Sequence, residues 1–423
     1  MRAAPVRRSV RTLRVVVLGS AMSGVFAAGC TALEPAAVGR SPLPLPAVVE
    51  AALTPPSPGW GLELALLDEA ETHERFGFSF RSFDELEGDF RVVRGELYRA
   101  RSGGPTPLIV LSPILAGPVD DYRASRYFAR AASARGVSAF FVHQETVILA
   151  PERDAWALEH RLRGNVRDNR RALALLAALP GVDPARLGSL GISLGAIKNV
   201  LLVASEPRLR ANVLCLAGAD VAGILLESRE GLVLDYLAAR ESREGLGPAS
   251  VAQEFADDLR SSAELAAAAI APRRVLLVLA RFDDKVPFAR GLELRRLLGD
   301  PATHVLPLGH YTSLLLAPWV AGVALDWMVE RWSAPGEVRP LFEERGGPAG
   351  AVRAGGQNSA GATVGCSRRD GYTPRLESVR RRARSSRRAD PPAVPPAVAS
   401  VARVSHVRRT PARASVPIRE DAD

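Results

Sequence analysis

Short apolar runs alternate with longer, helix-like stretches through the middle of the chain. The runs at 108–111, 137–142, 211–216 and 275–280 are almost continuously apolar, as expected of parallel strands that are buried on both faces. Helix-like stretches that end at glycine or proline lie between several of these runs. The alternation predicts an α/β fold with a mostly parallel central sheet flanked by helices.

Two segments depart from this pattern. Residues 90–98 have the pattern of an edge strand. Residues 221–270 are helix-prone, amphipathic in places, and fall between two predicted core strands. We interpret them either as a helical cap inserted over a site or as a pair of ordinary crossover helices.

The ends of the chain differ in composition from its middle. Residues 1–30 combine five arginines, an apolar stretch of signal-peptide length and small residues before Cys30. Residues 31–59 are rich in proline and alanine, which is typical of an extended tether. Arginine, glycine and proline dominate residues 336–423, which predicts a disordered tail. The folded domain is therefore expected at 60–335.

The first thirty residues resemble a lipoprotein-type bacterial signal sequence. That resemblance implies that Cys30 is lipidated and becomes the mature N-terminus, with the protein anchored in the bacterial cell envelope. The alternative is ordinary secretion with an incidental cysteine. Cys215 lies in an apolar run and is expected to be a buried, small hydrophobe.

The net charge of +9 comes from the two ends of the chain. The first thirty residues hold five arginines and no acid, and residues 345–423 hold sixteen arginines and six acids. Residues 31–344 are therefore left with a net charge of −6. Because the basic character belongs to the ends, we do not expect a nucleic acid as partner of the core.

A glycine-flanked serine is the first candidate for chemistry. Gly191-Ile192-Ser193-Leu194-Gly195 follows an apolar run and precedes a helix-like one. A serine nucleophile must project its hydroxyl from a turn that is too tight for ordinary side chains, and the two glycines remove the Cβ atoms that would collide there. The motif predicts Ser193 as a nucleophile between a strand and a helix.

An acid and a histidine follow later in the chain, each after a predicted strand. Asp283 lies directly after the run 275–280, and His310 follows the strand-like 304–308. A serine needs a base to take its proton, and the imidazole of that base needs an acid to hold its tautomer. Asp284 and Asp220 are alternative acids, the second placed one strand earlier.

With these three motifs in this order, the segment from about Trp60 to Trp332 resembles the α/β-hydrolase superfamily, in particular its serine esterase and dienelactone-hydrolase-like branch. The resemblance implies a catalytic triad of Ser193, Asp283 and His310. Asp-x-x-Val-Pro, starting at Asp283, matches the pattern of the family.

The same resemblance implies two backbone donors for an oxyanion. Leu194 follows the nucleophile directly and should supply one N–H. The second should come from the loop after Leu111, where relatives usually have His-Gly and this chain has Ser112-Pro113-Ile114. Because Pro113 has no N–H, Ile114 is the expected donor.

These features together predict a serine hydrolase that cleaves a carboxylic ester or related acyl bond of a small-molecule or lipid-like substrate. An acyltransferase would use the same triad, and a catalytically silent envelope binding protein could use the same fold. No cofactor and no metal are predicted, because glycine-rich phosphate loops and clustered metal ligands are absent from the sequence. His143 is expected either to line the substrate pocket or to pack as a polar residue. Lys198 is expected to be structural or on the surface.

Overall fold

The computed structural model describes residues 30–36, 40–56, 59–84, 87–115, 122–144 and 148–333. The chain divides into two units, Met1–Pro340 and Leu341–Asp423, and all described residues belong to the first. The signal-like residues before Cys30 and the arginine-rich tail lie outside the described part.

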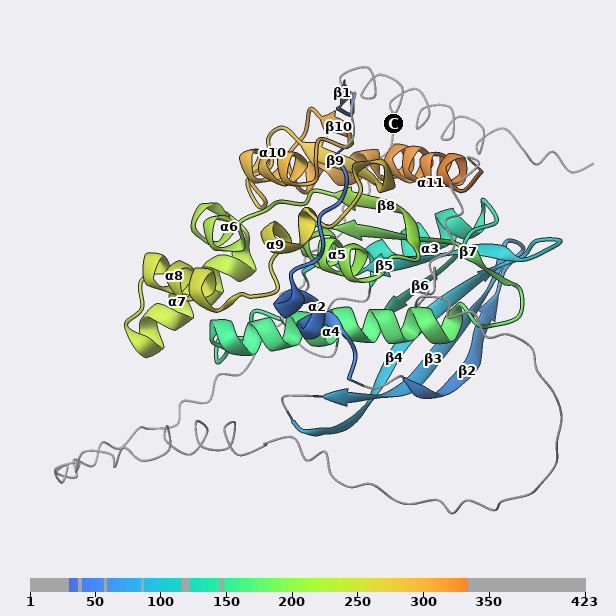
Figure 1. Ribbon diagram of the computed structural model, residues 1–423, viewed down its shortest axis with the longest axis horizontal. Coiled ribbons are helices and arrows are strands. Elements are labelled where there is room, and N and C mark those ends of the chain that lie inside the picture. The colour runs from blue at the N-terminus through green and yellow to red at the C-terminus, as the bar shows by residue number, and fades with distance from the viewer. Residues whose placement is uncertain are drawn as a thin grey trace, which may run out of the picture. The chain divides into compact units, whose positions relative to one another are not determined.

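A single mixed sheet forms the centre of the first unit (Figure 1). Its ten described strands lie in the order β1-β10-β9-β8-β7-β5-β6-β4-β3-β2. The strands from β10 to β6 run parallel, whereas β1 at one edge and β4, β3 and β2 at the other pair antiparallel. In chain order the strands are β1 (Thr31–Leu33), β2 (Trp60–Glu69), β3 (His73–Asp84), β4 (Asp89–Ala100), β5 (Thr106–Ser112), β6 (Ser138–Val142), β7 (Val182–Ile192), β8 (Leu209–Cys215), β9 (Val275–Ala280) and β10 (Ala302–Leu306).

Helices cover both faces of this sheet (Figure 1). Those that pack on one face are α2 (Ala47–Leu53), α4 (Ala155–Leu176), α5 (Leu194–Ser205), α9 (Ala263–Ala267) and α10 (Phe288–Leu297); those on the other are α3 (Arg123–Ser133) and α11 (Ala317–Ser333). Strand β5 shows why both faces need helices. Its apolar side chains alternate, with Leu108 and Val110 in the core of the first face and Ile109 and Leu111 in that of the second. Its continuous apolar run therefore serves two layers of core.

The remaining helices form the insertion between β8 and β9. They are α6 (Val221–Glu227), α7 (Gly231–Glu244) and α8 (Pro248–Asp258); α9, which packs on the sheet, and the short helix η1 (Pro272–Arg274) follow them before β9. Helices α6, α7 and α8 share a small core of their own, in which Leu225, Val233 and Phe255 are buried against Leu158 of α4. The insertion predicted at 221–270 is thus helical and packs as a cap, which is one of the two interpretations left open.

The sequence prediction for residues 90–98 was wrong in one respect. Strand β4 is an inner strand, because β3 and β2 continue the sheet beyond it. Most of β2 is exposed and charged residues interrupt both strands, so neither shows the apolar run by which the parallel strands are identified.

Two elements of the folded unit come from the range that was expected to be a tether. Strand β1 pairs with β10, with Thr31 opposite Val305. Helix α2 buries Val49 and Leu53 completely in the core beside α4 and α5. Within this helix the buried residues Val49, Ala52 and Leu53 recur at helical spacing, which distinguishes it from the proline-rich segments around it.

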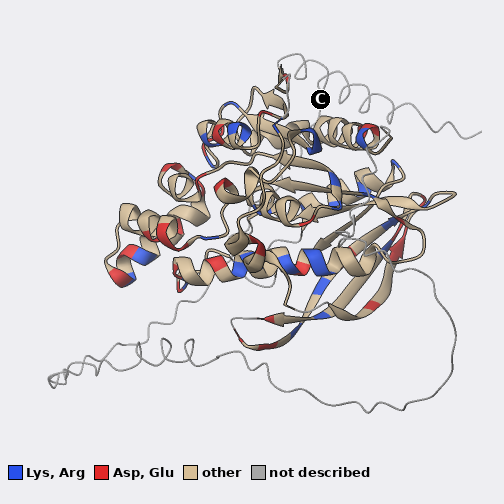
Figure 2. Ribbon diagram, viewed as in Figure 1, with Lys and Arg blue, Asp and Glu red and all other residues tan. Residues whose placement is uncertain are grey.

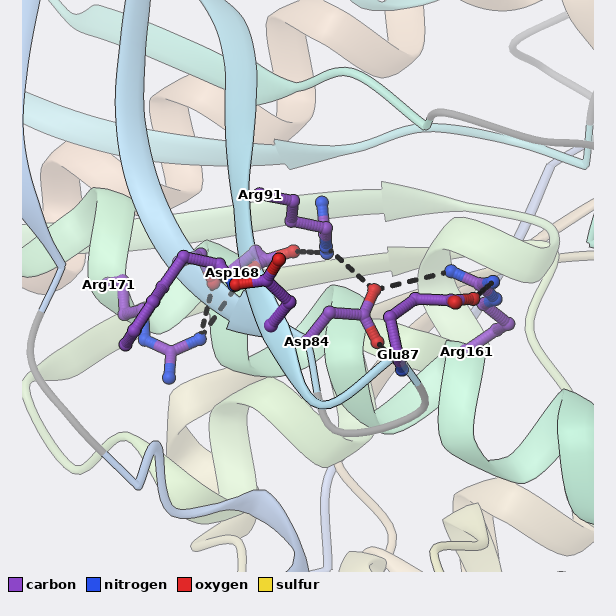
Figure 3. Close-up of polar contacts among 9 residues, drawn as sticks. Asp84, Glu87, Arg91, Arg161, Asp168 and Arg171 are labelled. Atoms are coloured by element: carbon purple, nitrogen blue, oxygen red, sulfur yellow. Dashed lines mark hydrogen bonds and ion pairs between the residues drawn. The ribbon is translucent and has the colours of Figure 1, made fainter.

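Charged side chains tie α4 to β3 and β4 (Figure 3). The carboxylate of Asp168 accepts a hydrogen bond from Ser82 at 2.5 Å and forms ion pairs with Arg91 and Arg171. Burial raises the pKa of Asp168 although both cations oppose that shift. Arg91 also reaches Asp84 at 3.0 Å, so one network spans both strands and the helix.

Charges of both signs are scattered over the described helices and strands (Figure 2). One stretch, Thr312–Ser333, is long and apolar enough to cross a membrane by length and composition alone. It comprises η2 (Thr312–Leu316) and α11, and Val320, Ala324 and Met328 are buried in the core at helical spacing.

Candidate active site

Ser193 lies on a sharp turn between β7 and α5. Its backbone angles, φ 55° and ψ −128°, belong to a region that residues other than glycine rarely adopt. The flanking glycines explain how the turn closes. A Cβ on Gly191 would come within 2.6 Å of the Gly195 oxygen, and one on Gly195 within 2.1 Å of the Ser112 oxygen. The predicted turn therefore has the geometry of a nucleophile elbow.

His310 and Asp283 follow two neighbouring strands, and His310 lies between Asp283 and this serine. His310 follows β10, and its Nε2 lies 3.0 Å from Ser193 Oγ. Asp283 follows β9, and its Oδ2 lies 2.8 Å from His310 Nδ1. Because a carboxylate can only accept, Nδ1 carries the proton and Nε2 offers its lone pair to the serine hydroxyl. The arrangement can deprotonate Ser193 and stabilise the imidazolium that forms.

The carboxylate of Asp283 is held by its own loop. Oδ1 accepts hydrogen bonds from the N–H groups of Lys285 and Val286, each at 2.9 Å. Both Asp283 and His310 are 8% exposed, so water competes little for their contact. The segment Asp-x-x-Val-Pro thus forms a turn that orients its first residue toward the histidine.

Neither alternative acid reaches the imidazole. The side chain of Asp284 is half exposed and lies 3.5 Å from Lys285. Asp220 caps α6 through the Gly223 N–H and pairs with Arg290 at 2.6 Å. Of the three candidate acids, Asp283 is the one in contact with His310.

No protein-family model and no curated protein matches the chain. Among solved structures, a cold-adapted esterase from an Arctic intertidal metagenomic library is 21% identical over 64% of this chain and 99% of its own, with a TM-score of 0.42. Acetyl xylan esterase 1 from Thermoanaerobacterium sp. JW/SL YS485 is 16% identical over 70% and 96%, with a TM-score of 0.48.

Likenesses of this size say nothing about substrate. What decides the fold is the strand order, with Ser193 after β7, Asp283 after β9 and His310 after β10, all at one edge of the parallel sheet. The chain has an α/β-hydrolase fold. The carboxyl ends of its parallel strands are where such sheets bind ligands.

The expected oxyanion donors belong to residues that follow two neighbouring strands, β7 and β5. Leu194 begins α5, where backbone N–H groups and the helix dipole favour a developing negative charge. Ile114 follows β5 and its carbonyl accepts a hydrogen bond from Gln144 Nε2 at 2.9 Å. Both residues line the same cavity as Ser193 and His310.

That cavity lies under the cap and measures about 160 Å³. Its polar lining residues are Ser193, Ser228, Glu230, Lys285, His310 and Tyr311. All its other lining side chains are aliphatic or, at Phe255, aromatic, and they come mainly from α4, α6, α7 and α8 and from the loops before them. Among the described residues, no group of three or more His, Cys, Asp or Glu side chains is placed to hold a metal ion.

Three residues named from sequence have a clear place. His143 stacks on Tyr122 with ring centroids 4.7 Å apart and is not part of the cavity lining, so it packs as a polar residue. Cys215 is buried, and burial raises the pKa of its thiol to about 12. Lys198 is not on the surface: it is 2% exposed and donates to Gln144 at 3.0 Å.

Gln144, which donates to the Ile114 carbonyl beside the cavity, was not singled out by sequence reasoning. Nothing around it in the sequence marks it, because an isolated glutamine after a strand has no motif. Its position at the end of β6, one strand from β5, was the available signal.

Proposed function

We propose that this protein is a serine hydrolase that cleaves a carboxylic ester through an acyl-enzyme. One observation supports this most directly: a continuous hydrogen-bonded series from Asp283 through His310 to Ser193, which ends in an apolar cavity. The Ser193 oxygen attacks the ester carbonyl carbon while His310 Nε2 takes the hydroxyl proton. The carbonyl oxygen becomes an oxyanion facing the N–H groups of Leu194 and Ile114.

Collapse of this intermediate breaks the bond to the alcohol oxygen, which receives the proton from His310. Water then attacks the acyl-Ser193 carbonyl, again losing a proton to His310, and the acid is released as Ser193 regains its proton. In an acyltransferase an alcohol would replace this water. Product analysis with and without an added alcohol distinguishes the two reactions.

The lining of the cavity supports an aliphatic acyl group as the part of the substrate it holds. Ile224, Leu225 and Val233 of the cap line it together with Leu158 and Leu162 of α4. These aliphatic side chains offer no hydrogen-bond partners, so burying a polar substituent against them would be unfavourable. An alkyl chain, in contrast, gains free energy with every methylene that leaves water.

We therefore expect the specificity constant kcat/KM for p-nitrophenyl esters to rise with acyl chain length. Each methylene that enters the cavity should raise it by about threefold to fourfold, which corresponds to about 0.8 kcal/mol. The rise should stop once the cavity is filled. Steady-state kinetics from acetate to dodecanoate measure this. A specificity constant that is highest for acetate and falls with each added methylene would exclude the alkyl-binding assignment.

We also propose that Cys30 carries lipid and anchors the domain to a membrane. Thr31 lies opposite Val305 in the antiparallel pair of β1 and β10. Cys30, the residue before it, is therefore near the end of β10 that leads into the loop of His310. Phe282, Leu314 and Leu315 follow β9 and β10 and are 66%, 55% and 68% exposed. An anchor at Cys30 would bring these apolar side chains toward lipid, which fits a lipid-like ester as substrate.

Replacing Cys30 by serine should release the protein from the membrane fraction of a bacterial host. One acyl chain binds a membrane only marginally, whereas several chains on one cysteine hold a protein stably. Fractionation of cells that express the full chain, with mass spectrometry of the N-terminal peptide, measures both location and modification. An unmodified Cys30 in the wild type, or a mature chain that begins elsewhere, means a freely secreted enzyme.

A further inference from the structure

Helix α5 carries two buried polar side chains one turn after Ser193. Lys198 is 2% exposed and Asn199 is fully buried. Among the residues that the structure describes, Lys198 contacts no carboxylate, and its one hydrogen-bond partner is Gln144. A buried ammonium group without a counter-ion is costly, and the proposed chemical steps do not use it. Its position therefore calls for a functional explanation.

A relay of hydrogen bonds leads from this lysine to the loop after β5. Lys198 Nζ donates to Gln144 Oε1 at 3.0 Å, and Gln144 Nε2 donates to the Ile114 carbonyl at 2.9 Å. The order of donors fixes the glutamine amide: its oxygen faces the amine, so its NH₂ group must face the carbonyl. Burial lowers the pKa of Lys198 to about 7, and both the ammonium and the neutral amine can donate.

Two further contacts from α5 hold the end of β5, where this loop begins. Ser112 Oγ donates to Asn199 Oδ1 at 3.2 Å. Gly195 lies so close to the loop that an added Cβ would approach the Ser112 and Pro113 oxygens within 2.1 and 2.7 Å. The helix that presents Leu194 thus also determines where the β5 loop lies.

We propose that Lys198 and Gln144 are positioning residues that hold Ile114 in register with Leu194, so that both N–H groups meet one oxyanion. This rests on the proposed function, because it assigns a role within ester hydrolysis. The loop needs such support because Pro113 removes one donor and leaves Ile114 to supply the second N–H. Donors stabilise an oxyanion only at hydrogen-bond distance, so a small displacement of the loop reduces turnover.

Gln144→Glu tests this role directly. The glutamate keeps an acceptor for Lys198 and adds a counter-ion, but as a carboxylate it cannot donate to the Ile114 carbonyl and repels it. We expect kcat to fall by about tenfold or more with KM changed by less than about twofold, because the lost interaction acts in the transition state. The melting temperature should not fall. A role in stability alone predicts the opposite pattern, with activity retained.

A transition-state analogue provides the second readout. Ser193 adds to the carbonyl of an alkyl trifluoromethyl ketone, its proton passes to His310, and the product is a hemiketal oxyanion in the same position. The affinity of this ketone should fall in Gln144→Glu by the same factor as kcat. Lys198→Met, which removes the donor to Gln144, should change kcat and ketone affinity in the same direction. Gln253→Glu on the exposed side of α8 is the matched control and should change neither.

Wild-type kcat and ketone affinity in both Gln144→Glu and Lys198→Met would overturn the positioning role while leaving the hydrolase assignment intact. A wild-type protein without esterase activity would instead refute the proposed function on which this role depends.

Discussion

Ser193→Ala should lower kcat for a p-nitrophenyl ester by at least about a thousandfold, because removal of the nucleophile leaves only binding and the oxyanion donors. The turn itself should survive, since alanine differs from serine by the one oxygen that contacts His310. Steady-state kinetics on the purified protein measure the loss, and a thermal melt checks the fold. Ser205→Ala, at the other end of α5, is the matched control and should retain activity within a few fold.

Turnover close to that of the wild type in folded Ser193→Ala would mean that another group attacks the ester. The strained backbone at Ser193 would then have no catalytic purpose.

Asp283→Asn should lower kcat by about a thousandfold to ten-thousandfold, while Asp284→Asn and Asp220→Asn retain most activity. Asparagine can offer an NH₂ group to His310 Nδ1, which favours the tautomer with its proton on Nε2 and removes the base that Ser193 needs. It also removes the negative charge beside the imidazolium. The three variants, compared under identical conditions, carry the same chemical change at three places in the fold.

If Asp220→Asn were instead the damaging substitution, the catalytic acid would lie after β8 and not after β9. The contact between Asp283 and His310 would then have no catalytic role. The ion pair between Asp220 and Arg290 and its cap on α6 predict for this variant a loss of stability and not of turnover.

Much of the parallel half of the fold could be predicted from the sequence. Strands that are buried on both faces, such as β5 and β9, appear in the sequence as short, almost continuous apolar runs. An amphipathic helix would instead show apolar residues at every third or fourth position. Ser193, Asp283 and His310 could be found because each follows such a run and because the turn around the serine requires glycine. In these places local pattern and tertiary environment agree.

The antiparallel edge could not be predicted in the same way. Strand β2 is exposed along most of its length and β3 is only partly buried, so their apolar residues are interrupted by charged ones. Strand β1 has only three residues and exists because β10 offers it an edge. Gln144 and the buried state of Lys198 depend on which strands lie side by side, and this is a property of topology that no local motif encodes.

The central claim is that Ser193 is the acylated nucleophile, and covalent labelling tests it most directly. The full chain is incubated with a fluorophosphonate, digested, and its peptides are analysed by mass spectrometry, in parallel with Ser193→Ala and His310→Ala. We predict one adduct, on Ser193, whose formation abolishes ester hydrolysis, and no adduct in either variant. Ester hydrolysis that persists after stoichiometric labelling, or an adduct on another residue that accounts for the loss of activity, would contradict the account.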